Sequence, residues 1–252
     1  MLNFNAMSLF SRLIRYALRN FMGFGTITHV KTKKNVVSLT FDDGPSPNYT
    51  PQLLDILKRY NAKVTFFMLG KNAQRYPHIV KRAIQEQHAI GNHSFDHPSF
   101  PLITGQERRS QLRSCQQVIL LHKKRLFRPP FGHQTFASRL DALLMRYTVI
   151  GWNVHGEDWL DHDADTIASN IEKKIRPGSI IVLHDNLNDV YEIRYADRMP
   201  TLDAVDIILK RLSGRFLFVT IPELLKYGRP NRNYWVRKGT AKWYDSLNAV
   251  GE

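Results

Sequence analysis

The chain has 252 residues, 43% of them hydrophobic, enough for one large α/β domain or two small ones with a buried core. This composition excludes a disordered chain, a collagen-like repeat and a coiled coil, and the single cysteine, Cys115, excludes an intramolecular disulfide. The net charge of +14 is concentrated in residues 1–41 and 226–252, which together hold twelve basic and two acidic residues. Because the body of the chain is near neutral and carries no nucleic-acid-binding motif, nucleic acid is not expected as a partner.

The first predicted element is an amphipathic helix over residues 9–21. Apolar residues recur there at helical spacing, and Arg12, Arg15 and Arg19 lie on another face. Since these arginines interrupt the apolar run, we expect neither a bilayer-spanning helix nor a conventional cleaved signal peptide here. A peripheral membrane contact, a helix packed on the domain and a targeting sequence all remain open. We therefore expect a cytoplasmic or peripherally membrane-associated protein.

From residue 36 onward, short apolar runs alternate with longer segments of helical periodicity. Strands are predicted over residues 36–41, 64–69, 89–92, 126–128, 148–152, 179–183 and 216–221. Helices are predicted over residues 51–61, 77–87, 105–122, 135–146, 164–175 and 199–213. This alternation predicts a parallel sheet with helices outside it, in a single domain because no long polar linker interrupts the series. Barrel-like closure and an open doubly wound sheet are both compatible with the pattern.

Polar clusters follow five of these strands at their carboxyl ends. In chain order they are TFDDGP at 40–45, HSFDHP at 93–98, RPPFG at 128–132, GEDW at 156–159 and IVLHD at 181–185. Each alone has a simpler interpretation, such as a solvated turn for the first, but random polar clusters would not all follow strand ends. Parallel β/α folds collect their active-site loops at that edge, so the five clusters together predict an active site.

The first two clusters contain the residue types of a catalytic metal site. Of the adjacent carboxylates Asp42 and Asp43, one can bind a metal while the other stays free as a base. His93 and His97, four residues apart, form with one carboxylate a facial set that leaves positions open for water and substrate. Asp96, between the two histidines, is interpreted as structural.

The other three clusters contain groups that could support catalysis. The two prolines of RPPFG stiffen a turn that can direct a backbone N–H at a developing oxyanion, and Arg128 can pair with a carboxylate. His184 leaves a buried apolar run and suits a proton donor, and Asp158 could hold its ring and raise its pKa.

In order and spacing the five clusters resemble the motifs of polysaccharide deacetylases, the NodB-like domain of carbohydrate esterase family 4. The likeness covers roughly residues 36–225, which leaves 1–35 as a basic lead-in with the amphipathic helix and 226–252 as a basic aromatic tail. The resemblance implies a distorted seven-stranded β/α barrel. It also implies metal-dependent removal of N-acetyl groups from N-acetylglucosamine units of a glycan, whether peptidoglycan, a chitin-type oligosaccharide or a lipid-linked sugar.

Carried over position by position, the resemblance assigns a role to each candidate residue. The implied metal ligands are Asp43, His93 and His97. The metal is expected to be Zn²⁺, with Co²⁺, Ni²⁺ or Mn²⁺ as alternatives. Asp42 would be the general base, oriented by Arg128, and His184, supported by Asp158, would protonate the leaving amine. The residues expected around the substrate are Pro130, Phe131, Trp159, Val182 and Leu183.

Two departures from the family's motifs bear on substrate preference, Val182 in place of leucine and His155 where an aspartate is common. An O-acetyl ester hydrolase acting on acetylated polysaccharide is the alternative within the same class. An inactive glycan-binding module is the alternative from another class, and the presence of every expected acid, base and metal ligand argues against it. The sequence predicts no oligomeric state.

Overall fold

A computed structural model describes residues 25–119, 125–160, 162–190, 193–233 and 235. The predicted amphipathic helix over 9–21 and most of the C-terminal tail lie outside these residues. The strands are β1 (Thr26–Lys31), β2 (Val36–Asp42), β3 (Thr65–Met68), β4 (Ala89–Asn92), β5 (Leu126–Phe127), β6 (Thr148–Val149), β7 (Val154–His155), β8 (Ile180–His184), β9 (Leu217–Phe218) and β10 (Arg229–Asn233).

The helices lie between the strands. They are α2 (Thr50–Arg59), α3 (Gly70–Arg75), α4 (Pro77–Gln85), α5 (Gly105–Val118), α6 (Phe136–Leu144), α7 (Ala164–Glu172), α8 (Met199–Leu212) and α9 (Ile221–Leu224), with short 3₁₀ helices η1 (Phe100–Leu102), η2 (Pro130–Gly132) and η3 (Ile193–Ala196). Among the described helices, none is long and apolar enough to span a bilayer.

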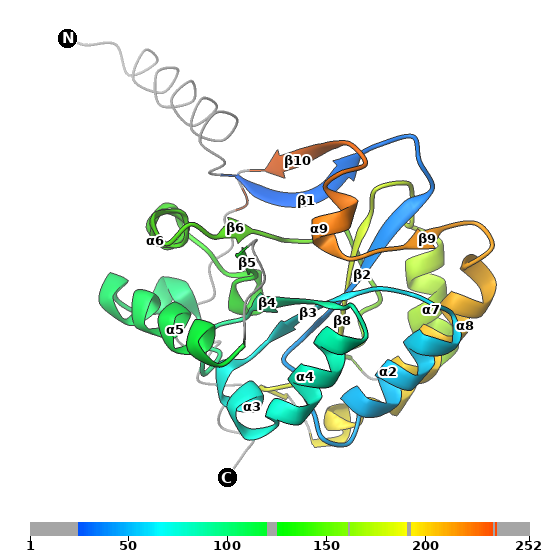
Figure 1. The fold of residues 1–252 in the computed structure, drawn as a ribbon, viewed down its shortest axis with the longest axis horizontal. Helices are drawn as coiled ribbons and strands as arrows, with labels where there is room; N and C mark the ends of the chain where they lie inside the picture. The colour runs from blue at the N-terminus through cyan, green and yellow to red at the C-terminus, as the bar shows by residue number, and fades with distance from the viewer. Residues whose placement is uncertain (1–24, 120–124, 161, 191–192, 234, 236–252) are drawn as a thin grey trace.

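Seven parallel strands form a curled sheet in the order β6-β5-β4-β3-β2-β8-β7, with helices on its outer face (Figure 1). The distorted seven-stranded barrel is thereby confirmed. One strand differs from the prediction, because the seventh place belongs to the two-residue strand β7, which was not predicted. The predicted strand over 216–221 is reduced to β9, which lies off this path and pairs with the start of β2.

All six predicted helices are present and begin within one residue of their predicted starts. Pro51 and Pro77 lie in the first turns of α2 and α4, where the missing N–H costs no hydrogen bond. Thr104 and Glu107 form a capping box that starts α5. Helices α3 and α9 were not predicted, because they are too short to show helical periodicity.

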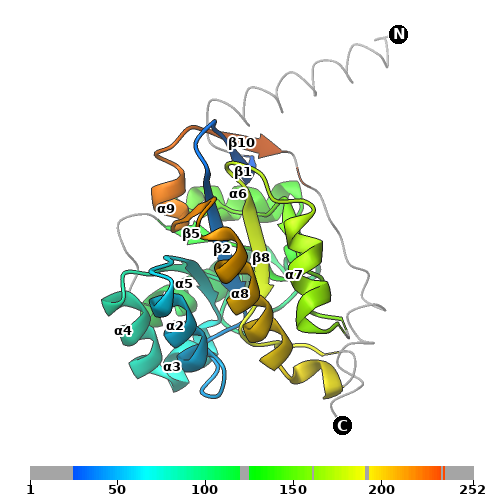
Figure 2. The same ribbon diagram turned by 90° about the vertical axis from the view of Figure 1, so that its right-hand side faces the viewer.

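Strands β1 and β10 form an antiparallel two-stranded ribbon that joins the segments before and after the predicted catalytic domain. The ribbon is bridged to the barrel at Ile27–Ile150 and His29–Ser179. It lies at the end of the sheet from which β2 and β8 start, as Figure 2 shows. Neither strand was predicted; β10 has the sequence RPNRN, in which no apolar alternation indicates a strand.

The central strand β2 carries the first motif, and all seven of its residues are buried. Its apolar side chains Val37, Leu39 and Phe41 belong to a core that also contains residues of α2, α4, α7 and α8. Burying each such side chain contributes about 1.5–3 kcal/mol, so the position of this strand is strongly specified. Its last residue, Asp42, is therefore placed at the carboxyl edge of the sheet by packing that begins several residues earlier.

Candidate active site

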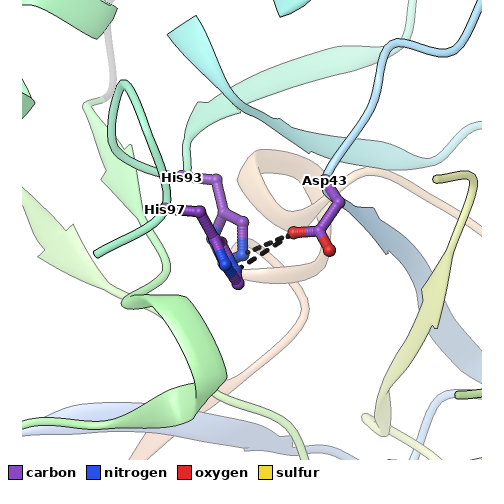
Figure 3. Close-up of side chains that lie close together, drawn as sticks. All are labelled: Asp43, His93 and His97. Atoms are coloured by element: carbon purple, nitrogen blue, oxygen red, sulfur yellow. Dashed lines mark ion pairs between the residues drawn. The ribbon is translucent and has the colours of Figure 1, made fainter. Parts of the chain in front are cut away.

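Three side chains suited to bind a metal converge at the carboxyl edge of the sheet (Figure 3). Asp43 directly follows β2, and His93 directly follows β4, with His97 farther along the same loop. Because β2 and β4 both flank β3, their ends lie close together. Oδ1 of Asp43 lies 3.3 Å from Nε2 of His93 and 3.2 Å from Nε2 of His97, and all three residues are buried.

The arrangement of these ligand atoms fits a divalent cation. Two ligand atoms bound to zinc at about 2.0–2.1 Å and a tetrahedral angle lie ~3.3 Å apart, close to the separations found here. Oδ1 of Asp43 is buried and has no hydrogen-bond partner in the described part of the chain. Burial alone would raise the pKa of Asp43, but His97 and His93 hold it well below its usual range. The carboxylate is therefore charged and has one oxygen available to a cation.

The far ring nitrogen of each histidine has an acceptor that orients the ring. Nδ1 of His93 donates to the backbone carbonyl of Arg128 at 2.7 Å, and Nδ1 of His97 donates to Oδ2 of Asp189 at 2.5 Å. With Nδ1 protonated, Nε2 of each ring keeps its lone pair toward the position between the three side chains. Asp189 was not among the predicted residues.

Residues 186–189, in the loop after β8, also hold Asp43. The backbone N–H of Asn188 donates to Oδ2 of Asp43 at 3.0 Å, and its side-chain amide donates to Asp189 at 2.9 Å. The side-chain amides of Asn72 and Asn186 donate to the Asp43 carbonyl at 2.8 and 3.4 Å. The only sequence signal was a run of Asn and Asp directly after the fifth motif, which is also the composition of an ordinary turn.

Asp42 is paired with Arg128, as predicted. Nη1 of Arg128 donates to Oδ1 of Asp42 and to Oγ1 of Thr40, both at 2.7 Å, and Nη2 donates to the carbonyl of Gly151 at 3.0 Å. The guanidinium lies 4.2 Å from the ring centroid of Phe67. Arg128 is fully buried, and this set of partners fixes both its plane and the carboxylate it holds.

His184 is held by Asp158, also as predicted. Oδ1 of Asp158 accepts from Nδ1 of His184 at 3.1 Å, and Oδ2 accepts from the His184 backbone N–H at 2.8 Å. Burial would lower the pKa of His184, but the charges of Asp158, Asp43 and Asp42 raise it to about 9. Two residues that were not predicted hold Asp158: Nη1 of Arg198 donates to its backbone carbonyl at 2.6 Å, and Oγ1 of Thr201 donates to its Oδ2 at 3.3 Å.

The residues expected around the substrate do not all lie at the site. The Phe131 ring centroid is 4.4 Å from that of His97, and the Trp159 ring centroid is 5.8 Å from that of His184. Pro130 begins η2, which contains Phe131. Val182 is buried in β8 and pairs with Thr40 of β2.

The prediction that Leu183 lies around the substrate is wrong, because Leu183 belongs to the apolar core shared with α7 and α8. Neighbouring residues of a strand point to opposite faces, so Leu183 does not share the face of Val182.

Three of these residues have left-handed backbone conformations. The φ angles of Asp43, His97 and Phe131 are 71°, 71° and 57°. Such a conformation costs a residue other than glycine roughly 1–2 kcal/mol, so the surrounding contacts must stabilise it.

Behind Asp43, a Cβ atom on Gly44 would lie only 2.3 Å from Oδ2 of Asp185, a buried carboxyl that Thr50 hydrogen-bonds. Burial and the charges of Asp43 and Asp42 outweigh that bond and raise the pKa of Asp185 to about 7.

Comparison with known proteins gives the family of this chain. A family profile described as polysaccharide deacetylase matches residues 29–150. A peptidoglycan-N-acetylglucosamine deacetylase of Bacillus cereus is 34% identical over 203 residues, which cover 79% of this chain and 71% of the relative. This chain belongs to the polysaccharide deacetylase family. A chitooligosaccharide deacetylase of Azorhizobium caulinodans is 32% identical, over 76% of this chain and 94% of the relative.

Solved structures of polysaccharide deacetylases share the fold. A peptidoglycan N-acetylglucosamine deacetylase in complex with 4-naphthalen-1-yl-N-oxidanyl-benzamide superposes with a TM-score of 0.75 at 31% identity, covering 86% of this chain and 99% of that one. A family 4 pseudoenzyme of Bacillus anthracis superposes with a TM-score of 0.71 at 26% identity, over 82% of this chain and 71% of that one. The family therefore includes active and inactive members. Because both share the fold, only the side chains at the site indicate to which group a member belongs.

Proposed function

We propose that this protein is a metal-dependent N-deacetylase, which hydrolyses the acetamido group of N-acetylglucosamine units in a glycan and releases acetate. The observation that carries this proposal is the buried cluster of Asp43, His93 and His97, with the Asp42–Arg128 and His184–Asp158 pairs at the same edge of the sheet. Residues 36–225 would form the catalytic domain. The same complete set of side chains argues against an inactive glycan-binding module.

Asp43, His93 and His97 would hold the metal, and Zn²⁺ fits their ligand types and spacing best, with Co²⁺, Ni²⁺ or Mn²⁺ as alternatives. When bound there, a divalent ion would lower the pKa of water and polarise a carbonyl group. Three protein ligands leave the remaining positions to water and substrate. Asp42, adjacent to this cluster and held by Arg128, would take the proton of the attacking water.

His184 would act on the leaving group. Cleavage of an amide C–N bond expels a strongly basic nitrogen unless that nitrogen receives a proton as the bond breaks. The raised pKa of His184 keeps its ring protonated at neutral pH, and Asp158 fixes the ring so that Nε2 is the donor. The backbone N–H of Phe131 would donate to the developing oxyanion, while Trp159 and Val182 would bound the acyl group.

The class of substrate can be assigned, whereas the individual glycan is left to experiment. The Bacillus cereus relative is named for N-acetylglucosamine in peptidoglycan and the Azorhizobium caulinodans relative for chitooligosaccharides. Both are glycans with an acetamido sugar. We therefore assign the substrate class as an N-acetylated glycan, with peptidoglycan, chitin-type oligosaccharides and lipid-linked sugars as the candidates to compare.

Acetate release tests the proposal directly. Chelated protein, zinc-restored protein and the Asp42→Asn variant would be assayed on N-acetylated chitooligosaccharides, peptidoglycan fragments and an O-acetylated xylan. We expect release that requires metal and that falls by a factor of roughly 10² to 10⁴ in the variant, because an amide cannot take the proton. Asp42→Asn should still bind the metal, whereas Asp43→Asn, which keeps a side chain tolerated at a left-handed φ, should not.

Three outcomes would contradict this assignment. Release from xylan alone would indicate an O-acetyl ester hydrolase. Near-wild-type turnover in Asp42→Asn would exclude that residue as the base. Metal binding without release from any substrate, a lipid-linked N-acetylated sugar included, would indicate a glycan-binding role.

A further inference from the structure

The end of the barrel opposite the metal ligands has two hollows. The first, of about 510 Å³, is lined by residues at the starts of β5 and β6 and by residues of β10. The second, of about 690 Å³, is lined by the turn between β1 and β2 and by residues just before β8. Since the strands are parallel, these amino ends lie together, and Figures 1 and 2 show them on the side of the β1–β10 ribbon.

The residues that line both hollows include basic side chains but no acidic ones. Seven of the lining residues are Lys or Arg and none is Asp or Glu: Lys31, Lys33, Lys34, Arg125, Arg146, Arg176 and Arg232. We call these seven residues the basic end. Five of them are exposed: Lys31, Lys33, Lys34, Arg146 and Arg176. Within the described part of the chain, none of these five forms an ion pair, unlike Arg59, Arg82 and Arg211 on the helices.

The concentration of positive charge already acts on a neighbouring group. Burial and the charges of Arg176 and Lys31 lower the pKa of His29, which also lines the second hollow. Like charges held together repel one another, so an anion that binds beside the five exposed cations relieves an existing cost. Arginine and lysine at the edge of open hollows suit phosphate groups, which accept several N–H bonds at once.

We propose that the basic end docks on a membrane surface rich in anionic lipids and binds their phosphate groups. The described chain starts at Gly25, whose carbonyl accepts a hydrogen bond at 3.0 Å from Arg232 in the first hollow. Residues 1–24, with Arg12, Arg15, Arg19 and apolar residues at helical spacing, therefore join the domain at this end. An anionic bilayer can bind the basic residues through its phosphate groups and the apolar residues through its acyl chains, whereas a soluble polyanion can bind only the basic residues.

Docking in this orientation leaves the catalytic edge free. Asp43, His93 and His97 follow the carboxyl ends of β2 and β4, so they face away from a bilayer that contacts the amino ends of the strands. A membrane-docked molecule would present its site to a glycan polymer at a distance from the lipid surface. Hydrolysis of a soluble substrate should consequently not depend on the basic end.

Vesicle sedimentation of the full chain tests the proposal. The probes are vesicles of phosphatidylcholine alone and vesicles with roughly a third phosphatidylglycerol, at physiological salt. The test variant is Lys33→Glu/Lys34→Glu/Arg176→Glu at the basic end. The matched control is Arg75→Glu/Lys81→Glu/Arg113→Glu, which reverses three exposed cations on α3, α4 and α5 and lowers the net charge equally.

We expect the wild-type protein to sediment with the anionic vesicles only, and the basic-end variant to bind them at least tenfold more weakly. The control variant should stay within about twofold of wild type, and both variants should keep wild-type thermal unfolding and hydrolysis of a soluble substrate. Equal losses in both variants would show that net charge alone acts. Undiminished binding of the basic-end variant, or no binding by wild type, would overturn the proposal. Tighter binding of soluble polyphosphate than of vesicles at equal phosphate would assign the basic end to a polyanion instead.

Discussion

Asp189 accepts a hydrogen bond from Nδ1 of His97 at 2.5 Å, although 92 residues separate the two in the chain. Asp189 also accepts from the side chain of Asn188, whose backbone N–H holds Oδ2 of Asp43. One short segment after β8 therefore orients two of the three proposed metal ligands. Such outer contacts fix the tautomer and the direction of a ligating ring, and they raise its basicity.

Replacing Asp189 should weaken metal binding before it affects the fold. We expect Asp189→Ala to reduce zinc affinity roughly 10- to 100-fold, and Asp189→Asn to have a smaller effect because an amide oxygen still accepts from Nδ1. Competition with a chromophoric chelator measures the affinity. The control is Asp96→Asn, since Asp96 lies between the two histidines in sequence but is exposed and bonds Gln111. Equal effects at both positions would contradict the role of Asp189.

The His184–Asp158 pair predicts the alkaline side of the pH profile. In the proposed mechanism the acid form of His184 is the active one, and its raised pKa keeps that form present until the pH approaches about 9, above which amide hydrolysis should decline. An ion bound at Asp43 offsets one of the negative charges, so the decline in the metal-loaded enzyme should begin lower.

Asp158→Asn removes the strongest attraction acting on the His184 ring. Its alkaline decline should move to lower pH by roughly 1–3 units, because the neutral amide no longer favours the charged ring. The kcat profile on an amide substrate measures this shift. Hydrolysis of an activated ester needs little protonation of its leaving group and should change much less. An unmoved amide profile would exclude His184 as the titrating acid.

Arg128→Lys should be a damaging substitution despite keeping the charge. A lysine ammonium cannot reproduce the planar set of bonds to Thr40, Asp42 and Gly151. We expect a loss of about 2–4 kcal/mol in the free energy of unfolding, because buried acceptors lose their donors. Thermal unfolding should then occur roughly 5–15 °C lower. Arg211→Lys, at a half-exposed surface pair, is the control and should change the melting temperature little. A melting temperature equal to wild type in Arg128→Lys would contradict this account.

Gly44→Ala should disturb the loop that carries Asp43. The added Cβ would lie 2.3 Å from Oδ2 of Asp185, which is buried and hydrogen-bonded by Thr50, so the carboxyl or the loop must move. We expect weaker zinc binding and a stability loss of about 1–3 kcal/mol, as for overpacked cores. Gly214→Ala, with no atom within 4 Å of the new Cβ, should change neither property. If Gly44→Ala is tolerated equally well, the close contact does not constrain the loop.

Much of the site could be predicted because each motif is local and follows a strand. Asp42 ends β2 and Asp43 follows it, His93 follows β4, and His184 ends β8. A correct strand assignment therefore already places them at one edge of a parallel sheet. From the residues alone, Arg128 is predicted only to pair with a carboxylate at this edge, and the resemblance to the family implied that this carboxylate is Asp42. The resemblance to the family supplied the roles, and the family itself is confirmed.

The sequence by itself determined the alternation of strands and helices from residue 36 onward, the edge at which the motifs meet and the residue types of a metal site, because short-range periodicity and strand ends encode them. Only the tertiary structure decided that Asp189 holds His97, that Arg198 and Thr201 hold Asp158, and that Leu183 faces the core. These contacts join residues 40 to 92 positions apart, and one residue of register decides which face a strand residue takes. The pairing of β1 with β10, and with it the basic end, depends likewise on packing between segments that carry no local signal for each other.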